Sequence, residues 1–457
     1  MSIAKLGKML AMWAVLAAAF LVVSASAESK ARIVRLSEVQ GTVQIDRAAG
    51  DGFDKAFVNL PVIEGSRLKT GKDGRAEVEF EDGSALRLAP ASEVDFTRLA
   101  LGDDGQKLST VQLISGTVYA NFHPKKSGQK SDQIQLNFAR ESVMVSDSAH
   151  FRVELADATA KLVVFKGKLS ATTPSGEFEL TEKHTATIDL AGDAGDGNPA
   201  RKDAFVIAKN YEAEPSDAWD RQQTDYHDRY SSAGGSGISS PYGYGMSDLN
   251  YYGSFMNVAG YGNVWQPYFI GADWSPFQDG GWSFYPGFGY MWVSGYPWGW
   301  MPYNYGNWAF APGFGWVWQP GYYNPWYGIP QVVNPPVRTK VPTPPVRGHQ
   351  TVMVGRGLAA NPAVGAPRRL TINPGSAGFG VPRGSVRHLD HVAKTMERTS
   401  RPVVVATAPP VSTTARTTGF GTSLPPTSTS TRGGTSTGMA PMGTPHRSAA
   451  PPPSRPH

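Results

Sequence analysis

Residues 75–88 read RAEVEFEDGSALRL, and this stretch decides the first half of the fold. Apolar side chains recur at every second position on both sides of Asp82-Gly83, which is the period of a β-strand. Glycine tolerates the positive φ of a tight hairpin turn, so Asp-Gly between two such runs is a strong hairpin signal. We predict two antiparallel strands in a sheet with one buried face, formed by Ala76, Val78 and Phe80 on the first strand and Ala85 or Leu86 with Leu88 on the second.

The same alternation continues on both sides of this hairpin, over residues 32–190. It recurs in VQGTVQIDR, TVQLISGTVYANF, HFRVEL, KLVVFKGKLSATT and TATIDL, with Gly, Asp and Asn between the runs. The chain also has 51 Gly and 36 Pro among 457 residues, which favours β-rich or disordered structure over a helical enzyme. Short alternating runs at this spacing are typical of an all-β sandwich or barrel.

Several motifs in this region are specific enough to suggest a family. They are Thr70-Gly71, Gly74-Arg75-Ala76 and Asp82-Gly83-Ser84, within EGSRLKTGKDGRAEVEFEDGSALRLAPASEVDF (64–96). With VQLISGTVYANF and KLVVFKGKLSATTPSGEFEL, they resemble the exported sensor-like domain of FecR-type proteins. The sequence departs from that family at Ser66, where an acidic residue is usual, and around VSDSAHF, which replaces an Arg-Gly-Thr. The resemblance implies a FecR-like β fold and does not identify a ligand.

The N-terminus has the parts of a secretory signal. Lys5 and Lys8 precede an apolar run over residues 9–23, and Ala25-Ser26-Ala27 supplies small residues for cleavage. The run is shorter than the roughly 20 residues that span a membrane. We expect residues 1–27 to be a cleaved signal peptide, the mature chain to lie in the periplasm or at the cell surface, and no transmembrane span to remain. The chain has no Cys, which excludes disulfides and a lipid-modified cysteine.

Residues 191–247 form a predicted linker with one short helix. GDAGDGNP and SSAGGSGISSPYGYG have the composition of flexible joints. Between them, Ser216 is suited to cap a helix over about residues 217–230. Trp219 and Tyr226 would lie two turns apart on one face of that helix, which is expected to dock on a neighbouring element.

Residues 248–326 contain an internal repeat of aromatic units. GYGNVWQP starts at Gly260, GFGYMWVS at Gly287 and GFGWVWQP at Gly313, so the units recur after 27 and 26 residues. Repeats at a fixed period indicate supersecondary units that share one core. In the second unit, GWSF and YMWV are alternating strands and YPGFG has turn composition. We therefore expect each unit to be a β-hairpin.

Tryptophans on the hairpin strands are predicted to form the core of this region. Aromatic pairs across neighbouring strands each contribute about 0.2–1 kcal/mol. A membrane span is excluded, because the Gly and Pro residues would leave backbone groups unpaired in lipid. The region resembles a conserved aromatic repeat of unknown function that follows FecR-type domains in bacterial envelope proteins. The predicted structural aromatics are Trp265, Trp282, Trp292, Trp308 and Trp318.

The connector YPWGWMPYNY between the second and third hairpins has aromatics outside the strand pattern. They are Trp298, Trp300, Tyr303 and Tyr305. One interpretation is that they are core residues like the strand tryptophans. The other is that they lie on exposed turns and stack on sugars of peptidoglycan or polysaccharide. The second interpretation predicts that Trp298→Ala abolishes glycan binding without unfolding the protein.

No catalytic constellation is evident in the sequence. His123, His150, His184 and His227 have neither metal-ligand spacing nor a neighbouring nucleophile. There is no G-x-S-x-G motif, and a thiol enzyme is impossible without Cys. We predict a non-enzymatic protein with no cofactor, metal or nucleic acid, although two carboxylates remote in sequence could still form a glycosidase site.

Residues 331–457 are predicted to be a disordered basic tail. They are rich in Pro, Thr, Ser and Arg, with fifteen Lys or Arg against Asp390 and Glu397. Such composition buries too little apolar surface to fold. The tail is suited to contact an anionic envelope surface, and residues 389–400 could form a helix that binds a partner.

These observations favour an exported, non-catalytic envelope protein that binds or scaffolds an envelope protein or glycan. The first alternative is a FecR-like signal-transduction regulator of a sigma factor pathway. Only about eight residues precede the apolar run, which argues against a cytoplasmic domain that would hold a sigma factor. The second alternative is a polysaccharide-processing enzyme.

Overall fold

The computed structural model describes residues 32–103, 105–124, 126–127, 130–173, 176–190, 205–231, 243–323, 331–337, 339–355 and 369–407. The predicted signal peptide (1–27), residues 191–204 of the predicted linker and the chain beyond residue 407 lie outside this set. The described part is mainly β, as predicted, with few helices and no closed barrel. None of the helices within it is long and apolar enough to cross a membrane.

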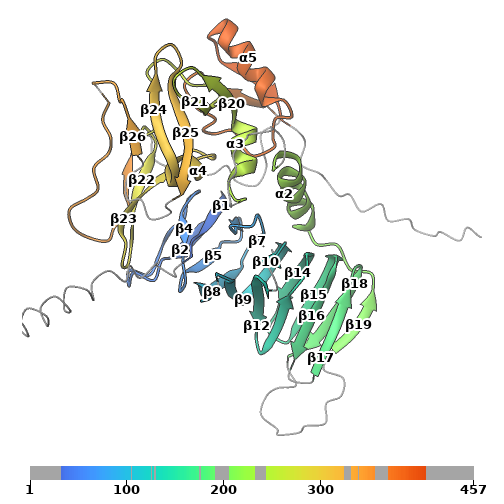
Figure 1. Cartoon of the computed structure of the whole chain (residues 1–457). Coiled ribbons are helices and arrows are strands. Elements are labelled where there is room, and N and C mark those ends of the chain that lie inside the picture. Colours follow the sequence, from blue (N-terminus) through green and yellow to red (C-terminus); the bar gives the residue numbers. More distant parts are fainter. Residues whose placement is uncertain are drawn as a thin grey trace, which may run out of the picture. The chain divides into compact units, whose positions relative to one another are not determined.

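Most strands of the N-terminal β domain (residues 32–209) form two sheets that share the long strand β9 (Lys107–Phe122) (Figure 1). The first half of β9 pairs with β8 (Glu93–Leu101) and β12 (Gln133–Phe138). The second half pairs with β7 (Ala85–Leu88) and β14 (Ala149–Leu155). Gly116 lies at the change of sheet, with φ of +83°, and a Cβ there would lie 2.5 Å from the Ala91 carbonyl oxygen. This position therefore requires glycine.

The strands of this domain are β1 (Val34–Gln40), β2 (Val43–Asp46), β3 (Phe53–Lys55), β4 (Pro61–Val62), β5 (Arg67–Thr70), β6 (Arg75–Glu79), β7 (Ala85–Leu88), β8 (Glu93–Leu101), β9 (Lys107–Phe122), β10 (Lys126–Ser127), β11 (Lys130–Ser131), β12 (Gln133–Phe138), β13 (Glu141–Val145), β14 (Ala149–Leu155), β15 (Thr159–Lys166), β16 (Lys168–Thr173), β17 (Gly176–Thr181), β18 (His184–Asp189) and β19 (Phe205–Lys209). The last strand pairs with β18 and extends the domain beyond residue 190, where we expected it to end.

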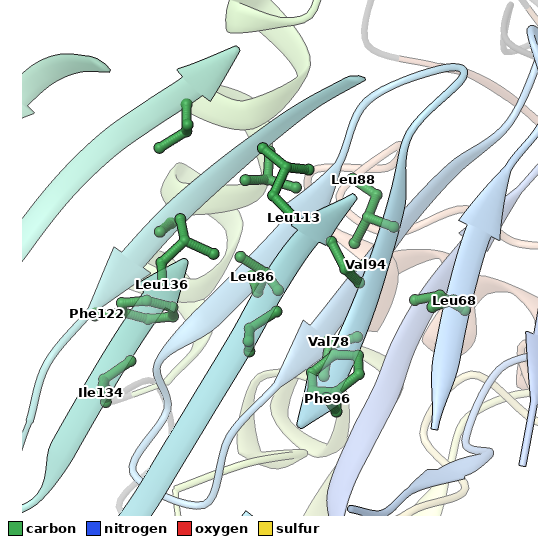
Figure 2. Packing of buried hydrophobic residues seen from close by; sticks show 14 of the residues in the cluster. Leu68, Val78, Leu86, Leu88, Val94, Phe96, Leu113, Phe122, Ile134 and Leu136 are labelled. Carbon is green, nitrogen blue, oxygen red and sulfur yellow. The ribbon is translucent and has the colours of Figure 1, made fainter. Parts of the chain in front are cut away.

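Aliphatic side chains and phenylalanines fill the space between the two sheets (Figure 2). The hairpin β6–β7 is confirmed: Ala76 pairs with Leu88 and Val78 pairs with Leu86. All four side chains are buried in this core. Gly83 has φ of +89° in the turn, as the Asp-Gly signal predicted.

The expectation of only one buried face on this hairpin is wrong. Glu77, Glu79 and Arg87 alternate with the core residues and point to the opposite face, yet each is at most 2% exposed. Helices and a C-terminal segment cover that face. Local alternation identifies which residues share a face, but it does not reveal what a distant part of the chain places over that face.

Two helices lie between the N-terminal β domain and the aromatic repeats. Helix α2 spans Asp217–Tyr230, which confirms the predicted helix. Trp219 and Tyr226 are both buried, as the predicted docking face requires. A second helix, α3 (Met246–Tyr252), begins the aromatic domain (residues 243–323).

Three hairpins form the aromatic domain, and each has the predicted cross-strand aromatic pair. Phe255 faces Trp265, Trp282 faces Trp292, and Trp308 faces Trp318. All five predicted structural tryptophans are buried. The elements are β20 (Gly253–Val258), β21 (Gly262–Pro267), β22 (Gly280–Tyr285), β23 (Gly289–Ser294), α4 (Met301–Asn304), β24 (Tyr305–Ala311) and β25 (Gly315–Tyr323).

The first and third hairpins join in one sheet, where Trp265 of β21 pairs with Trp318 of β25. Around this pair the contacts are reciprocal. The Gln266 amide donates to the Phe314 carbonyl oxygen at the tip of the third hairpin (2.8 Å). The Gln319 amide donates to the Tyr261 carbonyl oxygen at the tip of the first hairpin (3.0 Å). The second hairpin belongs to a different sheet, in which β22 also pairs with β27 (Val352–Val354).

The prediction that the whole tail from residue 331 is disordered is wrong for its first part. Among the described residues, 331–407 contain β26 (Gln331–Val333), β27 (Val352–Val354), β28 (Arg369–Ile372), α5 (Leu389–Thr399) and β29 (Val403–Ala406). Ile372, Val381, Val386, Leu389 and Met396 are buried against the aromatic core. Composition alone underestimated the order of this segment, because the apolar surface that the segment covers belongs to the aromatic hairpins.

Candidate functional site

A cluster of buried charged side chains joins the N-terminal β domain to the rest of the described chain. We call it the ionic junction. The domain contributes residues from β1, β6 and β7, whose neighbours in sequence point into the aliphatic core. Helices α2 and α3 and residues 381–386 contribute the others. The junction consists of Arg35, Glu77, Glu79, Arg87, Asp220, His227, Asp248 and Arg383.

Arg87 holds helix α2 on the sheet. Its Nε donates to Glu77 Oε2 at 2.8 Å, and its Nη1 donates to Asp220 Oδ1 at 2.6 Å. Arg87 and Glu77 are fully buried, and Asp220 is nearly so. Removing one member of a buried pair leaves an uncompensated charge and typically costs about 3–5 kcal/mol. The pairing therefore fixes where α2 can lie.

Arg383 connects the C-terminal segment to two other elements. Its Nη1 donates to Glu77 Oε1 at 2.7 Å. Its Nε and Nη2 donate to the two carboxylate oxygens of Asp248, both at 2.9 Å. Asp248 also accepts a hydrogen bond from Arg35 of β1, whose other Nη atom donates to Glu79 at 3.2 Å. One arginine thus bonds residues that are more than a hundred positions away in the chain.

His227 lies between the carboxylates of β6. Its Nε2 is 2.9 Å from Glu77 Oε1 and its Nδ1 is 3.1 Å from Ser247 Oγ. Burial lowers the pKa of this imidazole, but the charges of Glu77 and Glu79 outweigh burial and raise the pKa above its ordinary value. The protonated imidazole is therefore favoured in the folded protein.

The carboxyl groups of the junction respond differently to burial. Burial raises the pKa of Glu77, but His227, Arg87 and Arg383 outweigh that effect and hold the pKa well below its usual range. Asp248 follows the same pattern, with its pKa lowered by Arg383 and Arg35. For Glu79, burial is the larger effect, and the pKa is raised. The charge on Glu79 is thus the least stabilised of these three.

The second hairpin makes a separate contact with the N-terminal β domain. Val293 of β23 belongs to the aliphatic core of that domain. The Asn59 side-chain amide donates to the carbonyl oxygens of Ser294 (3.0 Å) and Tyr296 (2.7 Å). The Tyr285 hydroxyl donates to the Pro61 carbonyl oxygen at 2.8 Å. The hairpin therefore completes the core of a domain that precedes it in the chain.

Two family models match this chain, one within the N-terminal β domain and one over the aromatic domain and the residues just after it. The model described as FecR protein matches residues 66–170. This chain carries a FecR-type domain. A family of unknown function, DUF6600, matches residues 246–339, which include α3 and all three aromatic hairpins. The resemblance to FecR-type proteins is thereby confirmed for the N-terminal β domain.

Solved structures similar to this chain include two crystal structures from Parabacteroides distasonis, each provisionally described as that of an anti-sigma factor. Both have a TM-score of 0.26, with 14% and 15% sequence identity. The similarity covers 35% and 36% of this chain, and 71% and 72% of the other. No protein with a curated description matches the chain.

The structure buries all four connector aromatics in the aromatic core. Trp298, Trp300, Tyr303 and Tyr305 are 0%, 1%, 3% and 4% exposed. The Trp298 indole donates to the Ala377 carbonyl oxygen at 2.7 Å, and its ring stacks on Tyr296 at 4.9 Å. The expectation of exposed connector rings is therefore wrong. A residue beyond 369 contacts Trp298, whereas Trp300 packs on Tyr244 and the Tyr303 hydroxyl donates to the Pro276 carbonyl oxygen.

Sequence reasoning missed the ionic junction altogether. The available signal was the regular placement of Glu and Arg on the FecR-type hairpin, opposite its apolar residues, together with the acidic start of α2. Each pattern alone is typical of a solvated surface. Among the described residues, no group of three or more His, Asp or Glu could hold a metal ion. The junction's carboxylates instead face arginines and His227, an arrangement suited to holding elements together.

Proposed function

We propose that this protein is a non-catalytic, FecR-like signalling protein of the bacterial cell envelope. In this proposal the aromatic domain receives a ligand or partner, and the FecR-type domain presents the response to a second protein. Support comes from the FecR match and from the way the two regions are joined. The signal-like N-terminus supports export to the periplasm or cell surface.

The observation that carries the proposal is the docking of the second hairpin in the FecR-type core. The first and third repeats have Gln-Pro after the last strand Trp, and those glutamines join the two hairpins to each other. The second repeat has Val293-Ser294 at the same place, and Val293 enters the FecR-type core. One repeat has thus replaced a contact within the aromatic domain with a contact to the FecR-type domain.

Such a joint can transmit a binding event only if the ligand favours one arrangement of the joint over another. A buried ionic junction disfavours intermediate arrangements, because a partly opened junction leaves charges without partners. The two regions are therefore expected to move between discrete arrangements rather than to deform gradually. A scaffold that is always rigid would need the same contacts but would not respond to a ligand.

Site-specific photocrosslinking in intact cells tests the proposal. A crosslinking amino acid replaces Met144, which is 38% exposed on β13 of the FecR-type domain. A second variant carries it at Phe314, which is 48% exposed at the tip of the third hairpin. We expect the Met144 position to capture one discrete regulatory or receptor protein, in an amount that changes when Arg383→Ala opens the junction.

A second candidate function is the envelope scaffold or binding protein without signalling. The extent of the junction favours it, since many buried pairs hold the two regions together whether or not a ligand is present. Capture of only glycan or abundant structural proteins from both positions, unaffected by Arg383→Ala, would overturn the signalling proposal in favour of this one. We propose no enzymatic activity.

A further inference from the structure

Residues 335–347 read PPVRTKVPTPPVR and contain the motif PPVR twice, at 335–338 and at 344–347. We call residues 335–347 the proline segment. The valine of each motif is fully exposed, Val337 at 105% and Val346 at 95%, more than any other large apolar side chain in the part of the chain that the structure describes. A single exposed valine is ordinary in a soluble protein. A motif that occurs twice and exposes its valine both times indicates an interaction surface.

The prolines restrict the backbone of this segment. The Thr339 backbone N–H donates to the Pro336 carbonyl oxygen at 2.8 Å, so Val337 lies in a tight turn. From there to residue 345 the chain runs without helix or strand. Proline fixes its own φ at about −65° and keeps the residue before it out of the helical region. Prolines at 342, 344 and 345 therefore hold this stretch extended.

One side of the extended stretch lies on the molecule, and another faces solvent. Val341 packs on the aromatic core. Partial burial recurs at every third residue, at Thr339, Pro342 and Pro345. Exposure also recurs at every third residue, at Lys340, Thr343 and Val346. Three residues per turn is the period of a polyproline II helix. The segment thus presents one continuous row of side chains to a partner.

Contacts on both sides of the proline segment hold it in place. Before it, β26 pairs with β24 of the third hairpin. After it, the His349 ring stacks on Phe284 of the second hairpin at 4.2 Å, and β27 pairs with β22. A ligand that is already held in its bound conformation loses less entropy when it binds. The exposed row is therefore preorganised for docking.

The charges of the proline segment are all of one sign. It contains Arg338, Lys340 and Arg347 and no acidic residue. Lys340 and Arg347 are both exposed. Arginine pairs with carboxylates through a planar fork of donors, so a partner that offers Asp or Glu beside the docked segment is favoured.

A protein partner fits these features better than a membrane surface does. Segments that bind anionic lipids carry about four to eight cations or insert large apolar side chains such as Trp, Phe and Leu. The proline segment has three cations and none of those three residue types. Extended proline-rich segments are instead recognised by protein grooves lined with aromatic rings, on which proline and small apolar side chains pack.

We propose that the proline segment docks in a groove of a partner protein, and that this groove is lined by aromatic rings and by carboxylates. The docking itself rests on residues 335–347 alone. Its role as the receiving side of a signal rests on the proposed function. The route is short, because β27 pairs with β22, and β22 pairs with β23, which carries Val293 into the FecR-type core.

The first step of the test is photocrosslinking in intact cells. A crosslinking amino acid replaces Thr343 of the full chain, which lies in the middle of the exposed row. We expect it to capture one protein, with the crosslink mapped by mass spectrometry to a groove that has aromatic and acidic side chains. No captured protein, or a crosslink to a surface without such side chains, overturns the proposal.

The second step titrates the purified full chain with the purified captured protein by calorimetry. We expect Arg347→Glu and Val346→Asp each to weaken binding about tenfold, the loss that corresponds to roughly one charge-assisted contact or one buried side chain. Pro344→Ala changes no charge and should weaken binding about threefold by loosening the extended backbone. The three side chains are exposed, so the variants are expected to fold.

Arg401→Glu is the matched control, because Arg401 is exposed and lies outside the proline segment. Its affinity should equal that of the parent. Equal binding by all three segment variants and the parent overturns the proposal. So does cosedimentation of the full chain with phosphatidylglycerol–phosphatidylethanolamine vesicles that Arg347→Glu abolishes, which would assign the segment to a membrane surface. Capture at Met144 is a separate measurement, so the proposed function and this docking can fail independently.

Discussion

The two regions of this molecule build their cores from different residues. The N-terminal β domain has strands of up to sixteen residues, as in β9, and an aliphatic core without tryptophan among its described residues. The aromatic domain has hairpin strands of mostly six residues and a core dominated by Trp and Tyr. A buried aromatic ring removes roughly 150–250 Å² from water, so a few rings replace many aliphatic contacts. Short strands can then support a core.

The two regions also differ in how they satisfy buried polar groups. Each carboxylate of the ionic junction faces at least one arginine or His227. In the aromatic core, some indole N–H groups donate a hydrogen bond, namely those of Trp265, Trp274, Trp298 and Trp318. Others have no partner among the described residues, namely those of Trp282, Trp292, Trp300 and Trp308. The junction is therefore specified by directional pairs, whereas the aromatic core is held mainly by packing.

The largest expected effect tests whether the connector belongs to the aromatic core. Trp298→Ala should lower the free energy of unfolding by about 3–5 kcal/mol, because it removes a fully buried ring and its hydrogen bond to Ala377. Urea denaturation followed by circular dichroism measures this loss. Phe314→Ala, at an exposed hairpin tip, is the control and should change stability by less than about 0.5 kcal/mol. An equally small effect at Trp298 would mean that the connector lies at the surface.

Arg383→Ala tests how much the charge pairs of the ionic junction contribute to stability. The variant leaves Glu77 and Asp248 buried with fewer cationic partners, so we expect a loss of about 3 kcal/mol in the same denaturation assay. Arg87 and Arg35 still face these carboxylates, which keeps the loss at the lower end of the usual range. Arg387→Ala, four positions later and exposed, should have almost no effect. Similar stabilities of the two variants would contradict the claim that the charge pairs of Arg383 stabilise the fold.

Gly280→Ala tests how tightly the rings pack. A Cβ at this position would lie 2.5 Å from the Trp292 indole and 2.7 Å from the Val293 carbonyl oxygen. Overpacking of this kind typically costs about 1–3 kcal/mol. Gly271→Ala is the control within the same domain, since its nearest neighbour would be 3.5 Å away. Thermal unfolding that is equal for both variants would show that the indole can shift freely.

The smallest expected effect is a dependence of stability on pH through His227. Its pKa is raised in the folded protein, so its stabilising contribution is complete below the ordinary value of 6.5 and is lost as the pH rises through the folded pKa. Between pH 6 and pH 9, the parent should lose more thermal stability than His227→Gln, which keeps a donor near Glu77 but does not titrate. His391→Gln, exposed on α5, should behave as the parent does. If the thermal stability of the parent and of His227→Gln changes in parallel with pH, His227 does not cause the pH dependence.

Local patterns in the sequence were sufficient to predict the hairpins. The register of Ala76 with Leu88, and of Trp282 with Trp292, follows from alternation and turn residues within about fifteen positions. The junction could not be predicted in this way, because Arg87 and Asp220 are 133 positions apart and Glu77 and Arg383 are 306 apart. Trp298 looked exposed for the same reason, since the segment that covers it comes 79 positions later.

The central claim is that the FecR-type domain and the aromatic domain form one energetic unit through the ionic junction and the second hairpin. Native-state hydrogen exchange at increasing urea concentrations tests it most directly, with peptides that cover residues 75–88 and 280–294 compared in one sample. We predict that both peptides lose protection with the same free energy of opening and the same dependence on urea. Exchange of the 280–294 peptide at low urea, while the 75–88 peptide stays protected up to global unfolding, would contradict the claim.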